Sequence, residues 1–373
     1  MQDKFNMDGH KLHWHLDRVN NFMQGKRIAP LHIDLGITTG CNMACTYCYG
    51  VIQGRTGIST RTDMPAATLT RFFRDAKEVG VRSIAIIGEG ENTVNPAIWD
   101  AFACAKEIGL DISLATNGMI VPKDKIYDML SALTWIRINI SAADPESFYQ
   151  LHRVRQFENV CNNIRALVAA KKEHDLKTTI GMQMVVMSNN MDQIVPLANL
   201  GKELGADYLV VKACSDTKEK TLDSPSEKYL LIESTLKEAE ATSEGNYRVI
   251  IKWHKLQNKG TKDYKVCYGT NFILAISGKG CVYPCGHWFD IRSEEFFMGN
   301  INDTSFKDIV ASDRYAEVQQ KIQKVDVNCE CESNCRPHYV NRYLWQLKTT
   351  RKDDGAAVSP VPPGPAPEHV NFV

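Results

Sequence analysis

Three cysteines lie within eight residues of one another near the start of the chain, in the segment CNMACTYC. A structural zinc ion normally takes four protein ligands, and no fourth cysteine lies close by in the sequence. A cubane iron–sulfur cluster takes one thiolate for each of its four irons. Three thiolates, from Cys41, Cys45 and Cys48, would leave one iron with an open position, where a small molecule can bind and react.

The other cysteines also favour metal chemistry over disulfides. The chain has 12 cysteines in 373 residues, and a second group of them lies near the C-terminus, at Cys267, Cys281, Cys285, Cys329, Cys331 and Cys335. A hydrophobic fraction of 43% is enough for a large core, and the polar N-terminus does not resemble a signal peptide. We therefore expect a reduced, cytoplasmic protein. Cys104 and Cys161 fall in helical patterns and are expected to pack as small apolar residues.

Charge and hydropathy exclude several classes of partner. Lys plus Arg and Asp plus Glu number 44 each, so no overall charge attracts the chain to nucleic acid or to a membrane surface. The longest apolar runs, such as MQMVVM, are too short to span a bilayer. We expect neither a nucleic-acid nor a membrane partner.

Short apolar segments alternate with helical patterns from residue 31 to about residue 213. The expected strands are residues 31–37, 82–88, 111–116, 135–141, 179–187 and 207–213. This alternation predicts a parallel sheet covered by helices, in an α/β fold with a partial (β/α)6 TIM-like barrel. Chemistry in such a barrel belongs at the C-terminal ends of the strands.

The pattern changes after the last of these strands, which predicts further parts of the chain. We expect an N-terminal extension at 1–30, the barrel at 31–225, a small cysteine-rich domain at 226–348 and an extended Pro-rich tail at 349–373. The aromatic end of the tail is expected to pack on the body of the protein.

The motif C-x3-C-x2-C directly after the first strand resembles the signature of the radical S-adenosylmethionine (SAM) superfamily. The aromatic Tyr47 before the third cysteine also matches the family pattern. The resemblance implies that the open iron is chelated by the amino and carboxylate groups of SAM. It also implies that one electron cleaves SAM to a 5′-deoxyadenosyl radical, with an electron donor such as flavodoxin or ferredoxin as partner.

The resemblance continues after the second strand, in GEGENTVNP. This segment is similar to the family's Gly-Gly-Glu motif, with Glu89 in place of one glycine. The resemblance implies that Glu91 accepts a hydrogen bond from the SAM amino group. It also implies that Gly90 allows a close approach of the backbone.

Later strand ends carry three further matches. Asn117 lies in ATNG after the third strand, and Ser141 in INISAAD after the fourth. The resemblance implies that Asn117 lies near the cofactor and that Ser141 binds the ribose hydroxyls. Arg153, in LHRVR, is implied to pair with the SAM carboxylate, a task that suits a planar guanidinium.

The second group of cysteines resembles the SPASM extension or its shorter relative, the twitch domain, both of which hold auxiliary [4Fe–4S] clusters. Cys267 and Cys285 match its first half, whereas the closing half offers only Cys329, Cys331 and Cys335. We expect at least one auxiliary cluster, and favour a single one held by Cys267, Cys285 and two of the last three cysteines. A zinc ribbon built from the same cysteines is the alternative.

The sequence indicates the substrate less directly than it indicates the cofactors. About thirty residues precede the first strand, too few for a leader-peptide-binding domain, so we expect a small-molecule substrate. Polar residues expected to face inward, namely Asp216, Asn189, Asn190 and His287, favour a hydroxylated, sugar-like or aminocyclitol compound that is epimerised or dehydrogenated. The alternatives are a radical SAM maturase of a ribosomal peptide and, from another class, a zinc-dependent binding protein.

Cys214 separates the two expected reactions. It ends the sixth expected strand and so should point to the open end of the barrel. There its thiol would donate a hydrogen atom to a substrate radical in an epimerase. Without such a donor, the auxiliary cluster would accept the substrate electron in a dehydrogenase. The other interpretation is a buried, packed cysteine.

Overall fold

The computed structural model describes residues 4–7, 9–257, 260–350 and 364–373. Within these residues, one ten-stranded sheet has the order β12-β11-β10-β1-β4-β5-β6-β7-β8-β9, and β2 and β3 pair separately. The strands are β1 (His32–Leu35), β2 (Gly40–Cys41), β3 (Thr56–Gly57), β4 (Ser83–Ile86), β5 (Asp111–Thr116), β6 (Leu133–Asn139), β7 (Thr179–Val186), β8 (Tyr208–Ala213), β9 (Arg248–Ile251), β10 (Ile273–Ile276), β11 (Cys281–Tyr283) and β12 (Gly299–Asn300).

The large sheet is parallel from β10 to β9, and antiparallel only at β10–β11 and β11–β12. The strands predicted from the sequence are present as β1 and β4 to β8, which confirms the α/β fold with a parallel sheet. The sheet is wider than predicted, because β9 pairs with β8 at one edge and β10 pairs with β1 at the other. It therefore runs across the predicted boundary at 225/226, whose position stays a prediction.

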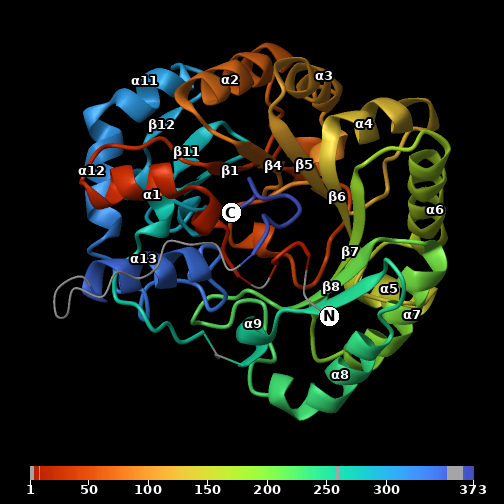
Figure 1. Cartoon of the computed structure of the whole chain (residues 1–373). Helices are drawn as coiled ribbons and strands as arrows, with labels where there is room; N and C mark the ends of the chain where they lie inside the picture. Colours follow the sequence, from red (N-terminus) through yellow and green to blue (C-terminus); the bar gives the residue numbers. More distant parts are fainter. Residues whose placement is uncertain (1–3, 8, 258–259, 351–363) are drawn as a thin grey trace.

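Helices surround the outer face of the sheet (Figure 1). They are α1 (Leu16–Met23), α2 (Ala66–Val79), α3 (Ile98–Ile108), α4 (Ile126–Ala132), α5 (Pro145–His152), α6 (Phe157–Glu173), α7 (Ile194–Leu204), α8 (Glu233–Ala241), α9 (Trp253–Gln257), α10 (Ser293–Phe296), α11 (Phe306–Ala311), α12 (Asp313–Ile322) and α13 (His338–Thr350). Three of the covering helices, α2, α3 and α7, end at a glycine in the left-handed conformation.

Side chains alternate between the two faces of each strand, which separates the core from the barrel interior. On β8, Leu209 and Val211 belong to the main hydrophobic core, whereas Val210 and Lys212 line a cavity inside the barrel. The same sheet therefore presents an apolar outer face to the helices and a mixed inner face to this cavity.

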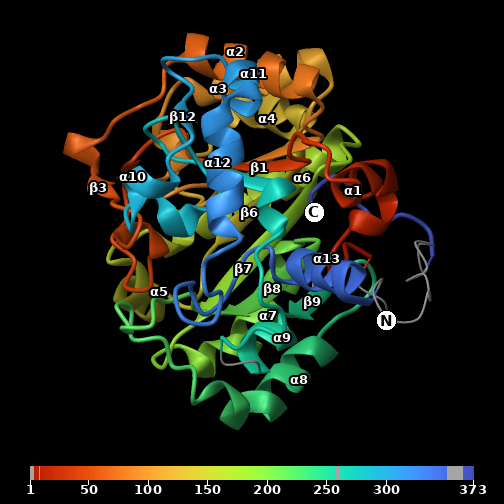
Figure 2. The same ribbon diagram turned by 90° about the vertical axis from the view of Figure 1, so that its left-hand side faces the viewer.

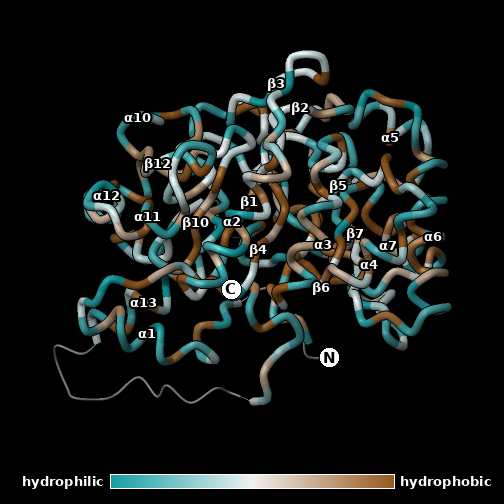
Figure 3. The backbone as a smooth tube through the Cα atoms, turned by 90° about the horizontal axis from the view of Figure 1, so that it is seen from above, coloured by the Kyte–Doolittle hydropathy of each residue, from teal (hydrophilic) through white to brown (hydrophobic). Residues whose placement is uncertain are grey.

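The two ends of the barrel carry different parts of the chain. Figures 2 and 3 show β2, β3 and α10 at one end, and α1, α13 and both chain termini at the other. At the second end Phe372 is buried, with its ring centroid 5.5 Å from those of His32 and Trp135. The aromatic end of the tail thus packs on the body as expected, while residues 351–363 of the predicted tail lie outside the described residues.

No helix in the described part of the chain is both long enough and apolar enough to cross a membrane.

Candidate active site

The CNMACTYC segment forms a loop beyond the C-terminal end of β1. Cys41 lies in β2, in register with Gly57 of β3. The thiols of Cys41, Cys45 and Cys48 lie close enough together to affect one another: burial raises the pKa of Cys45, and the neighbouring Cys48 and Cys41 raise it further. The structure therefore brings the three predicted cysteines together at one strand end.

The loop is fastened to the end of α5. The backbone N–H of Thr46 donates to the carbonyl oxygen of Leu151 (2.9 Å), and that of Ala44 donates to the carbonyl oxygen of His152 (3.2 Å). These bonds fix the loop backbone on both sides of Cys45, so its position depends on a helix about a hundred residues away.

Gly90 lies where two backbone segments meet. A Cβ at this position would lie 2.5 Å from the carbonyl oxygen of Gly40 and 2.6 Å from that of Thr38. The next residue, Glu91, donates its backbone N–H to the same Gly40 oxygen (2.8 Å). The close approach expected of Gly90 is therefore to the start of the cysteine loop, and a larger residue would push this loop away from β4.

The Glu91 carboxylate joins the ends of β4 and β5. It is buried and caps the short helix η4 (Asn92–Val94) by accepting from Thr93 N (3.1 Å). It also accepts from Thr116 Oγ1 (2.7 Å) and from Asn117 N (2.7 Å). The Asn117 side chain continues the connection by donating to Asn42 Oδ1 (2.7 Å) in the cysteine loop. Glu91 and Asn117 thus belong to one hydrogen-bonded layer at the strand ends, and their roles toward SAM stay predictions.

Tyr47 and Ser141 form a second buried connection. The Tyr47 hydroxyl donates to Ser141 Oγ (2.8 Å) and accepts from Asn139 Nδ2 (2.8 Å) at the end of β6. Ser141 Oγ also accepts from Val185 N (3.1 Å), and the serine backbone is left-handed, with φ of 54°. This turn presents the serine hydroxyl directly to the cysteine loop.

His152, which the sequence reasoning missed, is the last residue of α5. It is buried, with Nδ1 3.1 Å from Cys45 Sγ and Nε2 2.6 Å from the Ile140 carbonyl oxygen. Burial lowers the pKa of His152 to about 4, so the ring is neutral at neutral pH. Its only sequence signal is its position beside Arg153, which drew attention to the next residue instead.

Arg153 itself points elsewhere in the present structure. It is exposed, adopts the left-handed conformation (φ of 62°) that ends α5, and has no side-chain hydrogen bond or ion pair to another described residue. Its predicted pairing with the SAM carboxylate stays a prediction.

Glu89, which departs from the family motif, links the barrel to the C-terminal region. Its Oε1 accepts from Gly278 N (2.8 Å) in the β10–β11 turn, whereas its buried Oε2 has no hydrogen-bond partner among the described residues. Burial raises the pKa of Glu89 to about 7. This carboxylate therefore spans the two parts of the molecule that carry the cysteine groups.

Four of the later cysteines come together from three segments of the chain. The pKa of Cys331 is raised by burial and then by Cys267 and Cys335, and the pKa of Cys285 is raised by burial, Cys331 and, further down, Cys267. Asn341 Nδ2 of α13 lies 3.5 Å from Cys267 Sγ and 4.0 Å from Cys335 Sγ. The structure thus groups Cys267 and Cys285 with two of the last three cysteines, as the sequence led us to expect.

Cys281 and Cys329 lie outside this group. Cys281 starts β11, where its sulfur accepts from Asn300 Nδ2 (3.5 Å). Cys329 is exposed, with its backbone N–H donating to Asp326 Oδ1 (3.0 Å). Of the trio at 329–335, Cys329 is therefore the cysteine that the structure does not bring to the group.

A single metal ion and an iron–sulfur cluster space their ligands differently. Within the described ranges, no three His, Cys, Asp or Glu side chains converge as a single metal ion requires. In an iron–sulfur cluster each thiolate bonds a different iron, so the ligands stand further apart than around one ion.

Cys214 is buried directly after the end of β8 and lies between the two cysteine groups. Burial raises the pKa of its thiol to about 12; Asp216, Cys48 and Glu332 also raise it, and Lys212 lowers it. The sulfur is 3.4 Å from the carbonyl oxygen of Ser215. The thiol is therefore protonated at neutral pH, and it lies within electrostatic range of Cys48 in the first cysteine group and of Glu332 beside the second.

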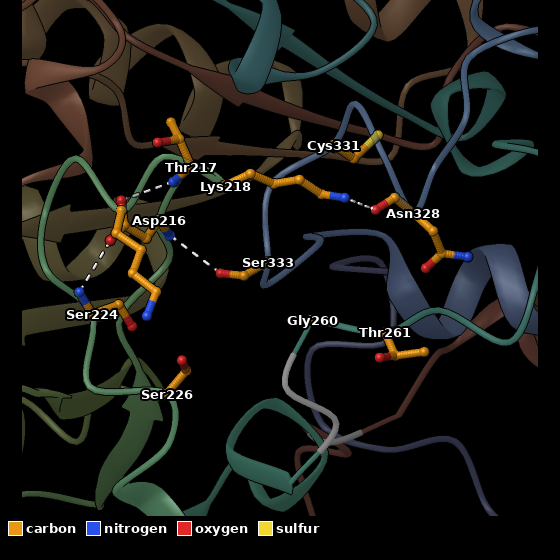
Figure 4. Close-up of a pocket in the computed structure, with 11 residues that line it drawn as sticks. Asp216, Thr217, Lys218, Ser224, Ser226, Gly260, Thr261, Asn328, Cys331 and Ser333 are labelled. Atoms are coloured by element: carbon orange, nitrogen blue, oxygen red, sulfur yellow. Dashed lines mark hydrogen bonds between the residues drawn. The ribbon is translucent and has the colours of Figure 1, made fainter.

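Asp216, proposed to meet substrate, is used by its own loop. Its carboxylate accepts from the backbone N–H groups of Thr217 (2.8 Å), Leu222 (3.0 Å) and Ser224 (3.0 Å). The residue borders a polar pocket of about 360 Å³, which Figure 4 shows between this loop and the segment of Cys331. Asp216 shapes the pocket wall and has little capacity left for a ligand.

The other polar residues expected to contact substrate are also committed or exposed. Asn190 donates to the carbonyl oxygens of Ser141 and Val185 (3.0 Å each), and His287 bonds Tyr49 and the Glu330 carbonyl oxygen. Asn189 is exposed. These side chains hold loops together, and they do not form a hydroxyl-binding surface.

Comparison with known proteins places this arrangement in a family. The sequence model of the radical SAM superfamily matches residues 35–200, and that of the SPASM iron–sulfur cluster-binding domain matches residues 267–336. The chain belongs to the radical SAM superfamily. Its cofactors are therefore SAM, a radical SAM [4Fe–4S] cluster and auxiliary iron–sulfur clusters. The three loop thiols fit the radical SAM cluster, and the later group of four thiols fits an auxiliary cluster.

Individual relatives cover most of the chain at low identity. An AdoMet-dependent heme synthase of Methanosarcina barkeri is 24% identical over 79% of this chain and 85% of its own length. A tungsten-containing aldehyde ferredoxin oxidoreductase cofactor-modifying protein of Pyrococcus furiosus is 22% identical over 76% of this chain and 82% of its own. The solved structure of SuiB of Streptococcus suis, bound to the precursor peptide SuiA, has a TM-score of 0.64 at 17% identity, over 90% of this chain and 80% of that one. At this identity the structural likeness shows the fold alone.

Proposed function

We propose that this radical SAM enzyme takes a hydrogen atom from a small polar substrate held inside the barrel, next to Cys214. The observation that carries the proposal is the position of Cys214, which is buried directly after the end of β8 and two residues beyond Lys212, a residue that lines an interior cavity of about 200 Å³. A volume of this size admits a small molecule or a single side chain.

The residues that would hold the cofactors follow from the geometry. Cys41, Cys45 and Cys48 would ligate the radical cluster, leaving one iron for SAM. The hydrogen-bonded layer would border the cofactor through Tyr47, Gly90, Glu91, Asn117 and Ser141, and Arg153 would pair with its carboxylate after a change of rotamer. When bound, SAM and the reduced cluster supply a hydrogen-abstracting radical. Cys267, Cys285, Cys331 and Cys335 would ligate an auxiliary cluster.

In this proposal Cys214 is the donor of a hydrogen atom to the substrate radical. The S–H bond breaks and a substrate C–H bond forms, which leaves a sulfur radical on Cys214. One electron and one proton must then restore the thiol before the next turnover, with a flavodoxin or ferredoxin as the external electron source. Burial supports the role, because it keeps the thiol protonated and shielded from solvent. The reaction is then an epimerisation; without the donor step it is a dehydrogenation.

The experiment uses the anaerobically reconstituted protein with SAM, dithionite and the small-molecule fraction of a cell extract in deuterated water. We expect 5′-deoxyadenosine formation to rise with this fraction, and product to carry one solvent deuterium, because a thiol proton exchanges readily. The Cys214→Ala variant should still form 5′-deoxyadenosine but give no deuterated product. Deuterium-free product from the wild type would exclude the donor role.

Maturation of a peptide is the second candidate. The fold likeness to SuiB and the polar pocket of about 360 Å³ beside Cys331 favour it. In the same assay, a rise in 5′-deoxyadenosine with the peptide fraction, and not with the small-molecule fraction, would support this candidate over the first.

A further inference from the structure

The interior cavity lies on the axis of the barrel. Above it, at the C-terminal ends of the strands, is the hydrogen-bonded layer that includes Glu91 and Asn117 and borders the cysteine loop (the strand-end layer). Its wall is formed by inward-facing residues of successive strands, including Ala85 of β4, Arg137 of β6, Gln183 of β7 and Lys212 of β8. Phe372 and its neighbours in the returning C-terminal segment close the opposite end. A ligand in this cavity would therefore face the cysteine loop on one side only.

Lys212 lies in the part of the cavity nearest the C-terminal ends of the strands. It pairs in register with Val185 of β7, whose backbone N–H donates to Ser141 Oγ (3.1 Å). Cys214 follows two residues later, directly after the end of β8, and its thiol and the Lys212 ammonium affect each other's pKa. Lys212 thus stands level with the strand-end layer and adjacent to the thiol of the proposed reaction.

The wall of the cavity is strongly cationic. One carboxylate, Asp34, lines it together with six cationic side chains: Lys11, Arg137, Lys212, Lys252, Lys255 and Arg336. Asp34 is already paired, with its Oδ1 3.0 Å from His32 Nε2 and its Oδ2 3.3 Å from Arg336 Nε. The wall of the cavity therefore carries more cationic than acidic side chains.

Three histidines line the wall, and two of them, His338 and His369, show the same electrostatic environment. Burial, and after it charges that include those of Lys11 and Arg137, lower the pKa of His369 to about 3. Burial also lowers the pKa of His338 to about 4. Both rings are neutral at neutral pH, so neither adds to the charge nor relieves it.

Lys212 is the cation that stands without a partner. Its ammonium group makes no hydrogen bond or ion pair with another described residue, although it can donate three. Burial, and after it the charges of Lys255 and Arg137, lower its pKa to about 7, against a smaller opposite effect of Cys214 and Glu332. An unpaired ammonium inside a protein is costly, and an anionic ligand would remove that cost.

Arg137 lines the side of the same cavity, and its position is fixed by neighbouring side chains. Its Nε donates to the Tyr208 hydroxyl (2.9 Å), and its guanidinium lies over the Trp135 ring, 4.7 Å from the centroid. The guanidinium is thus held in place by neutral groups and keeps its full charge for a ligand.

We propose that Lys212, together with Arg137, binds an anionic group of the substrate, a carboxylate or a phosphate, inside the barrel. The proposal rests on the proposed function, because it names the substrate class for that site. It adds a negatively charged group to the hydroxylated, sugar-like or aminocyclitol substrate expected from the sequence. The anion would anchor the substrate beneath the strand-end layer, and so place its reactive carbon near Cys214.

The test measures anion binding without SAM or reductant. Thermal stability of the anaerobically purified holoprotein is followed against increasing sodium phosphate and, separately, sodium succinate, with sodium chloride holding the ionic strength constant. Glycerol is the neutral probe. We expect saturable stabilisation by at least one of the two anions and none by glycerol. If only phosphate stabilises the protein the group is a phosphate, and if only succinate does so it is a carboxylate.

Variants of Lys212 decide whether this site is the one occupied. Lys212→Met and Lys212→Gln should bind the anion roughly tenfold or more weakly, and Lys212→Arg should retain binding. Lys123→Met, which removes an exposed lysine, is the matched control and should bind as the wild type does. Wild-type affinity in the folded Met and Gln variants, or no stabilisation of the wild type by either anion, would overturn the proposal.

The two proposals fail separately. If the wild type binds neither anion, the proposed function still stands, because it is tested through 5′-deoxyadenosine and solvent deuterium. Absence of 5′-deoxyadenosine leaves the anion site unaffected, because binding is measured without cofactor.

Discussion

The two cysteine groups of this protein are built in different ways. The first takes all its thiols from one eight-residue loop, whose backbone is fastened to α5 and packed against Gly90. The second takes Cys267, Cys285 and the pair Cys331 and Cys335 from three segments, which meet only because β10, β11 and α13 pack together. A loop-borne site depends on local geometry, whereas a site from separate segments also holds those segments in place.

The largest expected effect is in the loop group. Replacing Cys41, Cys45 or Cys48 with Ala should abolish 5′-deoxyadenosine formation while the fold survives, since the loop lies beyond the strand ends and the thiols are only partly buried. Product analysis and near-UV circular dichroism measure the two properties. The matched control is Cys104→Ala, which alters a buried cysteine of α3. Near-normal 5′-deoxyadenosine from any loop variant would contradict the assignment.

The second prediction separates ligands from spare cysteines in the other group. Cys285→Ser or Cys335→Ser should remove roughly four irons per chain, the content of one [4Fe–4S] cluster. Because these residues join separate segments, the same variants should also lower the thermal stability. Cys281→Ser and Cys329→Ser are the controls and should keep the full iron content. Iron loss in Cys329→Ser would mean that the last segment rearranges when the cluster binds.

The contrast also explains what the sequence could predict. Cys41, Cys45 and Cys48 are neighbours in the chain, so their spacing alone indicates their chemistry. The sequence leaves open which two of Cys329, Cys331 and Cys335 are ligands, because this depends on how the 326–335 segment turns against α13. The width of the sheet was underestimated for a related reason: β10 follows β1 by more than two hundred residues and pairs with it only in the folded protein.

The hydrogen bonds that a side chain makes are harder to predict from the sequence than the place of its residue in the fold. Asp216 was predicted to reach substrate because it follows a strand, but its carboxylate closes its own loop. His152 gave no periodic or motif signal, because its contact with Cys45 depends on how α5 ends. Lys212 lies in an ordinary apolar strand pattern, and only the cavity shows that it has no partner.

The third prediction concerns Glu89, which joins the two regions. Its pKa is raised from 4.5 to about 7 in the folded protein, so folding favours its protonated form. That stability is fully present below pH 4.5 and is lost as the pH rises through 7, by up to about 3 kcal/mol. Glu89→Gln should therefore be more stable than the wild type at pH 8, and the difference should vanish near pH 5.

Anaerobic thermal unfolding across this pH range measures the effect of Glu89. The matched control is Glu173→Gln, an exposed residue at the end of α6, which should leave the pH dependence unchanged. If Glu89→Gln keeps the pH dependence of the wild type, the buried Glu89 carboxylate is not the source of that dependence.

The smallest expected effect compares two tyrosines that flank Cys48 and bond opposite regions. Tyr47 bonds Ser141 inside the barrel, whereas Tyr49 bonds His287 Nδ1 (2.9 Å) in the C-terminal region. Each Tyr→Phe variant should lose about 1 kcal/mol for its hydrogen bonds. Hydrogen–deuterium exchange should locate the loss: faster exchange around residues 139–141 for Tyr47→Phe, and around residues 286–332 for Tyr49→Phe. Faster exchange in the same segment for both variants would mean that the two cysteine regions open as one cooperative unit. The distinction between a local and an assembled site would then apply to the origin of their ligands and not to their stability.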